Sequence, residues 1–129
     1  MKLRVVICCA ALALLVAGCN QTLTGSTKVG TPVLALRGNY TPSCETWEPP
    51  EPSLWTAPAH GRVTHALMRA PLRNKGGICD GKLIDYMAST YTPNPGFRGQ
   101  DRFTIKYDSI TDDGGGRETR STDIVVDVK

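Results

Sequence analysis

Two stretches in the last quarter of this chain place apolar residues at every second position. The first covers residues 103–108 and the second covers residues 122–128. This period puts one face of a strand in a core and the other in water, so both stretches are predicted to be half-buried antiparallel strands. Their apolar members are Phe103, Ile105, Tyr107, Ile124, Val126 and Val128. Beyond residue 18 no segment keeps a 3.6-residue apolar period, and the sequence therefore predicts an all-β fold.

Three further strands are predicted, at residues 32–36, 61–68 and 83–92. Residues 111–116 are acidic and rich in glycine, which is typical of a turn. Residues 42–58 contain several prolines, which favours a sheet edge or a surface excursion because proline lacks a donor for the ladder. Trp47 and Trp55 flank these prolines, and we expect at least one of them in the core. Short strands separated by turn signals predict an antiparallel β-sandwich.

The chain begins with a secretion signal. Lys2 and Arg4 accompany an almost wholly apolar run over residues 5–16, which is too short to cross a bilayer comfortably. The run leads into the tetrapeptide VAGC at residues 16–19, which resembles the lipobox of bacterial lipoproteins. The resemblance implies cleavage before Cys19 and acylation of that residue, and each buried methylene then contributes roughly 0.8 kcal/mol to membrane binding. An ordinary signal with a chance cysteine and an uncleaved anchor are the alternatives.

This interpretation divides the chain into three parts. Residues 1–18 are the signal peptide, residues 19–31 are the lipidated cysteine with a flexible tether, and residues 32–129 are the sandwich domain. The tether is expected because the segment after Cys19 has little apolar content and no periodicity. In the lipoprotein family an aspartate after the cysteine tends to retain the protein in the inner membrane. Asn20 occupies that position here, which favours the outer membrane of a bacterial envelope.

The cysteines indicate one disulfide. Cys8 and Cys9 lie in the signal and Cys19 is assigned to lipid, which leaves Cys44 and Cys79. Exported domains favour oxidised pairs, so these two are expected to be bonded. Such a bond would stabilise the fold by roughly 3–4 kcal/mol on the chain-entropy model. The alternative is a redox or metal pair, for which the sequence offers neither a CxxC spacing nor a histidine cluster.

The size and net charge of the chain limit the kinds of partner that it is expected to bind. Roughly 110 residues remain after removal of the signal, enough for one domain with a modest core. The formal net charge of the whole chain is +3, and the loss of Lys2 and Arg4 lowers it by two. A nearly neutral domain gives no electrostatic argument for a nucleic-acid partner or for a polybasic membrane contact.

The stretch YTPNPGFRGQDRF at residues 91–103, with PAHGRV at residues 58–63 before it, resembles bacterial Ig-like and cadherin-like repeat domains. The resemblance extends over about residues 57–128 and implies an Ig-like β-sandwich that serves as a spacer or binding module, without a catalytic apparatus. Prolines stop one strand, glycines supply a corner, an aromatic ring plugs the sandwich end, and a carboxylate accepts backbone N–H groups to fix the turn. The residues expected in these roles are Pro93, Gly96, Phe97, Gly99 and Asp101.

This chain departs from the repeat pattern in having a single copy, the cysteine pair and an insertion at residues 69–81. The insertion and the residue after it carry a group of basic side chains, which are Arg69, Arg73, Lys75 and Lys82. They form the candidate binding surface for an anionic glycan, lipopolysaccharide or an acidic protein patch. Solvated loop charge is the alternative.

Catalysis and metal binding find less support. The aspartates that could offer oxygen to calcium are Asp101, Asp108, Asp112 and Asp113. They lack the twelve-residue loop of alternating acids, so turn formation is the preferred interpretation. His60 and His65 are five residues apart and would face opposite sides of a straight strand. With no activated nucleophile in the sequence either, we expect no enzyme activity and no cofactor.

The sequence therefore predicts a lipid-anchored envelope protein whose Ig-like module acts in binding or structural support. An accessory subunit of a larger envelope, secretion or adhesion assembly is one alternative. A calcium-binding adhesion-type domain is another.

Overall fold

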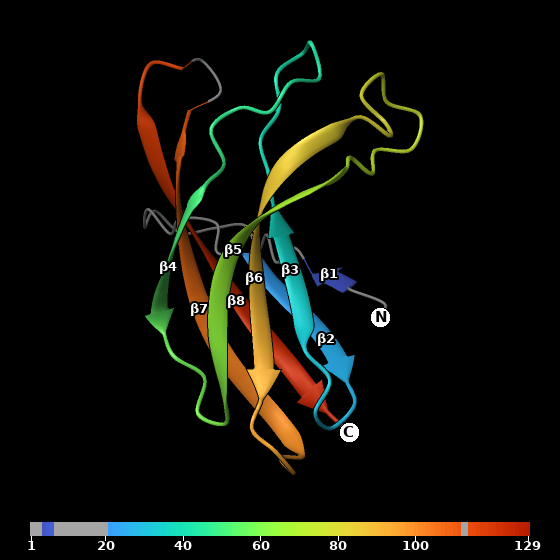
Figure 1. Ribbon diagram of the computed structural model, residues 1–129. Helices are drawn as coiled ribbons and strands as arrows, with labels where there is room; N and C mark the ends of the chain where they lie inside the picture. The colour runs from blue at the N-terminus through green and yellow to red at the C-terminus, as the bar shows by residue number, and fades with distance from the viewer. Residues whose placement is uncertain (1–3, 7–20, 112–113) are drawn as a thin grey trace.

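The computed structural model describes residues 4–6, 21–111 and 114–129, and these form two β-sheets packed against each other (Figure 1). The five-stranded sheet has the order β1-β2-β8-β7-β4, and the three-stranded sheet has the order β3-β6-β5. The strands are β1 (Arg4–Val6), β2 (Gln21–Thr27), β3 (Val33–Arg37), β4 (Glu51–Thr56), β5 (Gly61–Pro71), β6 (Leu83–Pro93), β7 (Gly99–Ile110) and β8 (Arg117–Val128). The described ranges contain no helix. The prediction of an all-β sandwich is confirmed.

The main core lies between the two sheets and is built from the alternating residues of β7 and β8. Phe103, Ile105 and Tyr107 are all buried, as their period of two predicted. Their partners on β8 are Ile124, Val126 and Val128. From the three-stranded sheet, Tyr91 packs its ring on Phe103 with centroids 5.3 Å apart. The core is therefore closed by aromatic and β-branched side chains supplied by both sheets.

The expected tether is wrong for residues 21–27. This segment is strand β2, which pairs with β8 over the whole length from Gln21–Thr122 to Thr27–Val128. The pairing is parallel, which is a departure from the predicted antiparallel pattern. A strand of threonine, serine and glycine shows no apolar period, and β2 is held by its ladder to β8 and by Leu23, which packs against the main core. The continuous part of the sandwich consequently begins at Gln21 rather than at residue 32. Strand β1 (Arg4–Val6), within the segment predicted to be a signal peptide outside the domain, also pairs with it.

Strand β4 is the end strand of the five-stranded sheet, so the expected edge within residues 42–58 is confirmed. It contains Pro52, and its register with β7 shifts between Leu54 and Thr56. The expectation of a core tryptophan is wrong. Trp55 lies on this edge strand with 67% of its surface exposed, and Trp47 is half-buried in the loop before it. The buried members of the main core come instead from strands β3, β6, β7 and β8.

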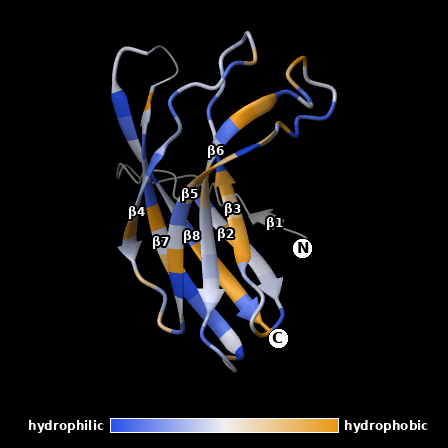
Figure 2. Cartoon of the chain, in the orientation of Figure 1, coloured by the Kyte–Doolittle hydropathy of each residue, from blue (hydrophilic) through white to orange (hydrophobic). Residues whose placement is uncertain are grey.

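The two ends of the sandwich differ. The upper end in Figure 1 carries the loops at residues 38–50 and 72–82, together with residues 111 and 114–116. The lower end carries the turns at residues 28–32, 57–60 and 94–98. At the upper end β5 and β6 curve away from the five-stranded sheet (Figure 1). Apolar residues there lie in the loop before β6 and at its start, apart from the main core (Figure 2).

Candidate binding surface

The loop at residues 72–82 joins β5 to β6 and is ordered by its own hydrogen bonds. Leu72 N–H donates to the carbonyl of Lys82 at 2.7 Å, and Gly81 N–H donates to the carbonyl of Leu72 at 2.8 Å. Within the loop, Asn74 N–H donates to Asp80 Oδ1 at 3.0 Å. Gly81 has a φ of 80°, a left-handed conformation that glycine adopts without strain. The loop therefore presents its side chains from a defined backbone.

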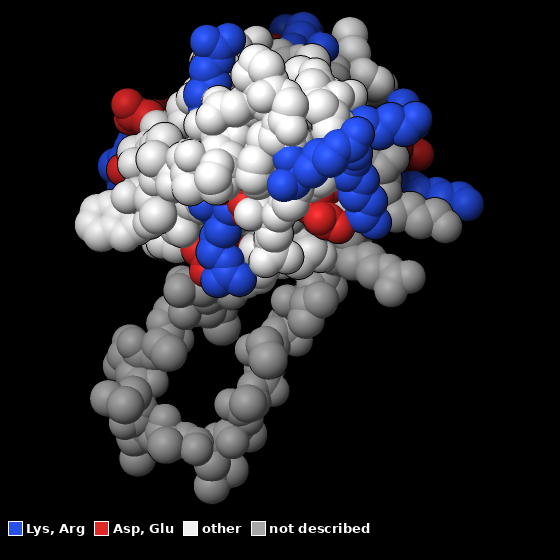
Figure 3. Space-filling view, turned by 90° about the horizontal axis from the view of Figure 1, so that it is seen from below, with Lys and Arg blue, Asp and Glu red and all other residues white. Residues whose placement is uncertain are grey.

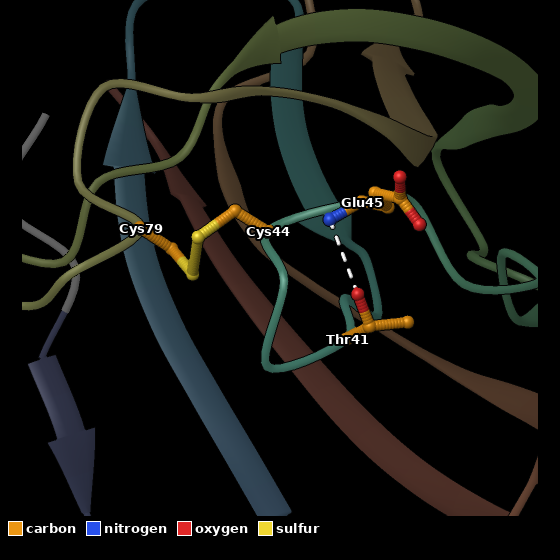
Figure 4. Close-up of a disulfide and its surroundings, with 4 residues drawn as sticks. All are labelled: Thr41, Cys44, Glu45 and Cys79. Atoms are coloured by element: carbon orange, nitrogen blue, oxygen red, sulfur yellow. Dashed lines mark hydrogen bonds between the residues drawn. A yellow bond between two sulfur atoms is a disulfide. The ribbon is translucent and has the colours of Figure 1, made fainter.

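A disulfide joins this loop to the one at residues 38–50. Cys44 and Cys79 are bonded with their Cα atoms 5.2 Å apart, which confirms the predicted pair (Figure 4). Cys44 lies in a tight turn closed by Thr41, whose Oγ1 accepts from Glu45 N–H at 3.2 Å (Figure 4). The cystine is part of a second, small core whose buried members are Leu72, Cys79 and Ile84. The bond thus attaches two long loops to each other at the upper end.

The four predicted basic residues lie together on the β5–β6 hairpin. Arg73, Lys75 and Lys82 are exposed on the loop, and Arg69 lies on β5 just before it. Arg69 Nη1 is 3.5 Å from Asp85 Oδ1, a surface ion pair that contributes little to stability. Residues 69–85 hold four cations against two aspartates, so this hairpin tip is positively charged. We call residues 69–85 the basic tip.

Exposed apolar side chains accompany these charges, and the sequence pattern did not single them out. Ile78 is 85% exposed at the turn of the loop, and Leu67 and Leu83 are also exposed. By alternation Leu67 shares the inward face of β5 with Val63 and His65, yet it is 66% exposed, and the upper part of β5 curves away from the opposite sheet (Figure 1). Binding surfaces commonly combine exposed apolar residues with charges at the rim. Ile78, an isoleucine within a glycine- and lysine-rich loop, was the signal available.

A groove lies at the upper end, between the loop at residues 38–50 and the end of β7. It has a volume of about 360 Å³, and its lining includes Trp47, Tyr40 and Asn39. A smaller hollow of about 150 Å³ adjoins it and is lined partly by Arg37 and Arg120. Aromatic and amide groups around an open groove can contact a sugar or a peptide.

The predicted corner at the lower end is confirmed in its backbone. Gly96 and Gly99 have φ values of 76° and 128°, which lie in the region that favours glycine. Pro93 is the last residue of β6. Phe97 packs against the main core and stacks on His60, with ring centroids 4.3 Å apart. Phe97 therefore covers the sandwich end as expected.

Asp101 accepts hydrogen bonds from backbone N–H groups, and two of these groups belong to a segment about 40 residues earlier in the sequence. Its carboxylate is 3.0 Å from Ala59 N and 2.9 Å from His60 N, in the connection before β5. It also accepts from Tyr91 Oη at 2.8 Å and from Arg102 N at 3.0 Å. Burial, with the hydrogen bond and charge of Asp101 added, raises the pKa of Tyr91 well above its usual range. Asp101 thus ties the connection at residues 57–60 and the core tyrosine Tyr91 to strand β7, rather than fixing only its own turn.

A serine, a histidine and a tyrosine form a chain of contacts in the interior. His65 Nδ1 is 2.9 Å from Ser89 Oγ, which is 3.1 Å from the hydroxyl of Tyr107. Burial lowers the pKa of His65 and raises that of Tyr107. A serine beside a histidine resembles a nucleophile and its base, but Ser89 is 2% exposed between the two sheets. These contacts satisfy the hydrogen-bonding groups of buried side chains, and Ser89 is not accessible to a substrate.

Two of the aspartates considered as calcium ligands, Asp101 and Asp108, lie too far apart to bind one ion. Asp101 and Asp108 are seven residues apart on β7, about 23 Å along the strand and on opposite faces, so they cannot hold one ion. Asp108 instead accepts a hydrogen bond from Thr119 Oγ1. Asp112 and Asp113 lie outside the described residues. Within the part of the chain that the structure describes, no group of three or more His, Cys, Asp or Glu side chains is arranged to hold a metal.

Comparison with known proteins assigns no family. No protein-family model matches this chain, and no curated protein matches it at a significant level. The described ranges contain no helix long and apolar enough to cross a bilayer. The rest of the predicted signal peptide beyond residues 4–6, and the predicted lipidation site at Cys19, lie outside the described residues.

Proposed function

We propose that this protein is a lipid-anchored module of the bacterial envelope that binds an anionic partner through the basic tip and performs no catalysis. The proposed anchor rests on the VAGC motif that follows an apolar run, and Cys19 is the residue proposed to be lipidated. The proposed location is the outer membrane. The disulfide between Cys44 and Cys79 supports export, because such bonds persist in oxidising compartments.

The place of β2 supports a domain that lies close to the bilayer. Only Asn20 separates Cys19 from the first residue of β2, a span of roughly 7 Å when extended. Strand β2 starts opposite Thr122, about halfway along β8, and runs towards the lower end (Figure 1). A domain held this close to the bilayer has its basic tip within reach of anionic glycan, lipopolysaccharide or the acidic surface of another envelope protein.

The lower end also carries basic side chains, which provides a matched control. Figure 3 shows Lys and Arg side chains around that end, and the exposed ones there include Lys28, Arg62 and Arg98. They are not joined to a second loop by a disulfide, and Phe97 beside them is packed against the core rather than exposed. Two features therefore favour the basic tip, which are the crosslinked loops and the exposed Ile78.

The test reverses three charges at each end. Arg69→Glu, Arg73→Glu and Lys75→Glu together are expected to abolish capture of partners by crosslinking in intact cells, read by mass spectrometry. The control, with Lys28, Arg62 and Arg98 changed to Glu, alters the net charge equally and is expected to retain capture. Unchanged capture by the first variant, or equal loss in both, would contradict the proposed surface. A single dominant envelope protein among the captured species would make this chain a subunit of an assembly.

The anchor is tested separately. Metabolic labelling with a clickable palmitate analogue is expected to mark the wild-type protein and to fail in Cys19→Ala. Label that persists in Cys19→Ala, or a wild-type protein that retains residues 1–18 by intact mass, would refute lipidation at this site. Because this readout does not depend on a partner, the anchor and the binding surface stand or fall independently.

A further inference from the structure

Strand β2 is a fixed part of the sandwich. It pairs with β8 over its full length, and Leu23 packs against the main core. Its end is closed by Lys129, which donates to the carbonyl of Thr27 at 2.8 Å and accepts from Val29 N–H at 3.0 Å. At its start, Arg37 of the opposite sheet donates to the Gln21 side chain. The edge of β2 that faces away from β8 is therefore held in a constant orientation.

In the full chain this edge is covered by β1. Strand β1 pairs antiparallel with β2, with Arg4 opposite Thr24 and Val6 opposite Thr22. Under the proposed function β1 belongs to the segment that is removed before Cys19. Cleavage then makes β2 the end strand of a four-stranded sheet, and the edge that β1 covered is open to another strand.

The other end strand of this sheet is protected against pairing, and β2 is not. Strand β4 carries Pro52 and a register shift between Leu54 and Thr56, both of which discourage the addition of a further strand. The end strand β5 of the opposite sheet carries Arg62 and ends in proline. The sequence of β2, QTLTGST, contains no charge and no proline, and its register with β8 is continuous. An unprotected, rigid edge of seven residues is a template for strand addition.

We propose that β2 of the mature protein pairs antiparallel with β2 of a second copy, so that two four-stranded sheets become continuous. The strand is complementary to itself about Thr24. In that register Thr22 lies opposite Ser26 of the second copy, and Thr24 lies opposite Thr24. Hydroxyl pairs of this kind stabilise antiparallel strands, and the uncharged edge offers no charge complementarity to a different partner. Anchoring in one membrane raises the effective concentration of the copies. This inference rests on the proposed signal cleavage.

The test is disulfide formation between copies of the full-length protein in its native membrane. In the central register the two Cα atoms of residue 24 lie roughly 4.5–5.5 Å apart, which is within disulfide range. Thr24→Cys is therefore expected to give a covalent homodimer on mild oxidation. The matched control is Ser53→Cys, an exposed position on the protected edge strand β4, which is expected to remain monomeric. Co-expression of Thr22→Cys with Ser26→Cys is expected to give a mixed dimer, and it serves as a second variant if Thr24→Cys folds poorly.

Intact mass of the same samples reports signal removal and lipidation. A cleaved, lipidated protein that gives no dimer from Thr24→Cys or from the co-expressed pair would overturn the inference and leave the anchor in place. Equal dimer formation by Ser53→Cys, or a crosslink to a different protein, would also overturn it. Retention of residues 1–18 would refute the proposed anchor and this inference together.

Discussion

Replacing Asp101 by Asn tests how much one buried carboxylate stabilises the lower end of the sandwich. The residue is 4% exposed, and its two oxygens receive four hydrogen bonds. Oδ1 accepts from Ala59 N and Arg102 N, and Oδ2 accepts from His60 N and Tyr91 Oη. Asn keeps the shape of the side chain and one acceptor oxygen. If that oxygen takes the place of Oδ1, the NH₂ group takes the place of Oδ2 and faces two donors, His60 N–H and the Tyr91 hydroxyl.

The expected loss follows from these partners. A hydrogen bond to a charged group contributes about 1.5–3 kcal/mol, and a buried donor left without an acceptor costs about 1–3 kcal/mol. The Tyr91 hydroxyl can rotate to accept from the new amide, whereas the His60 N–H cannot. One unsatisfied N–H together with the weaker remaining bonds gives an expected loss of about 3 kcal/mol in the free energy of unfolding.

Urea denaturation followed by circular dichroism measures this loss. With a denaturant dependence of about 1.5 kcal/mol per molar, the midpoint is expected to fall by about 2 M. The control is Asp123→Asn on β8, whose carboxylate accepts from Thr104 Oγ1 at 2.7 Å on the half-exposed outer face, and it is expected to cost below about 1 kcal/mol. An Asp101→Asn protein no less stable than Asp123→Asn would refute the assignment of Asp101 as the residue that ties the connection at residues 57–60 to strand β7.

Two further measurements test other parts of the fold. Cys44 and Cys79 enclose a separation of 35 residues, so replacing both by Ser is expected to lower the free energy of unfolding by about 3–4 kcal/mol, and an unchanged urea midpoint would contradict this. The lowered pKa of His65 means that the unfolded chain takes up a proton more readily, so stability is expected to fall as pH decreases through the ordinary value of 6.5, with a slope below about 1.4 kcal/mol per pH unit. His65→Gln should remove that slope, and a slope that persists would assign it elsewhere.

The candidate surface could be predicted from the sequence only in its charges. Arg73, Lys75 and Lys82 are close together in the chain, and a glycine-rich insertion is exposed because it cannot be packed in a core. The exposed Leu67 was not predictable, because its alternation within β5 assigns it to the inner face. Only the curvature of β5 away from the other sheet leaves it in solvent (Figure 1).

Local patterns in this sequence determined strands β3, β5, β6, β7 and β8, the corner glycines and the cysteine pair. A period of two and a requirement for positive φ act over a few residues, and export with two remaining cysteines permits one bond. Contacts between distant segments were decided only by the tertiary structure. The side chain of Asp101 meets His60 N across 41 residues of sequence, and β2 is a strand because it lies beside β8 near the far end of the chain. Its threonines and glycine carry no apolar period, so nothing local distinguishes it from a tether until the ladder of β8 satisfies its backbone.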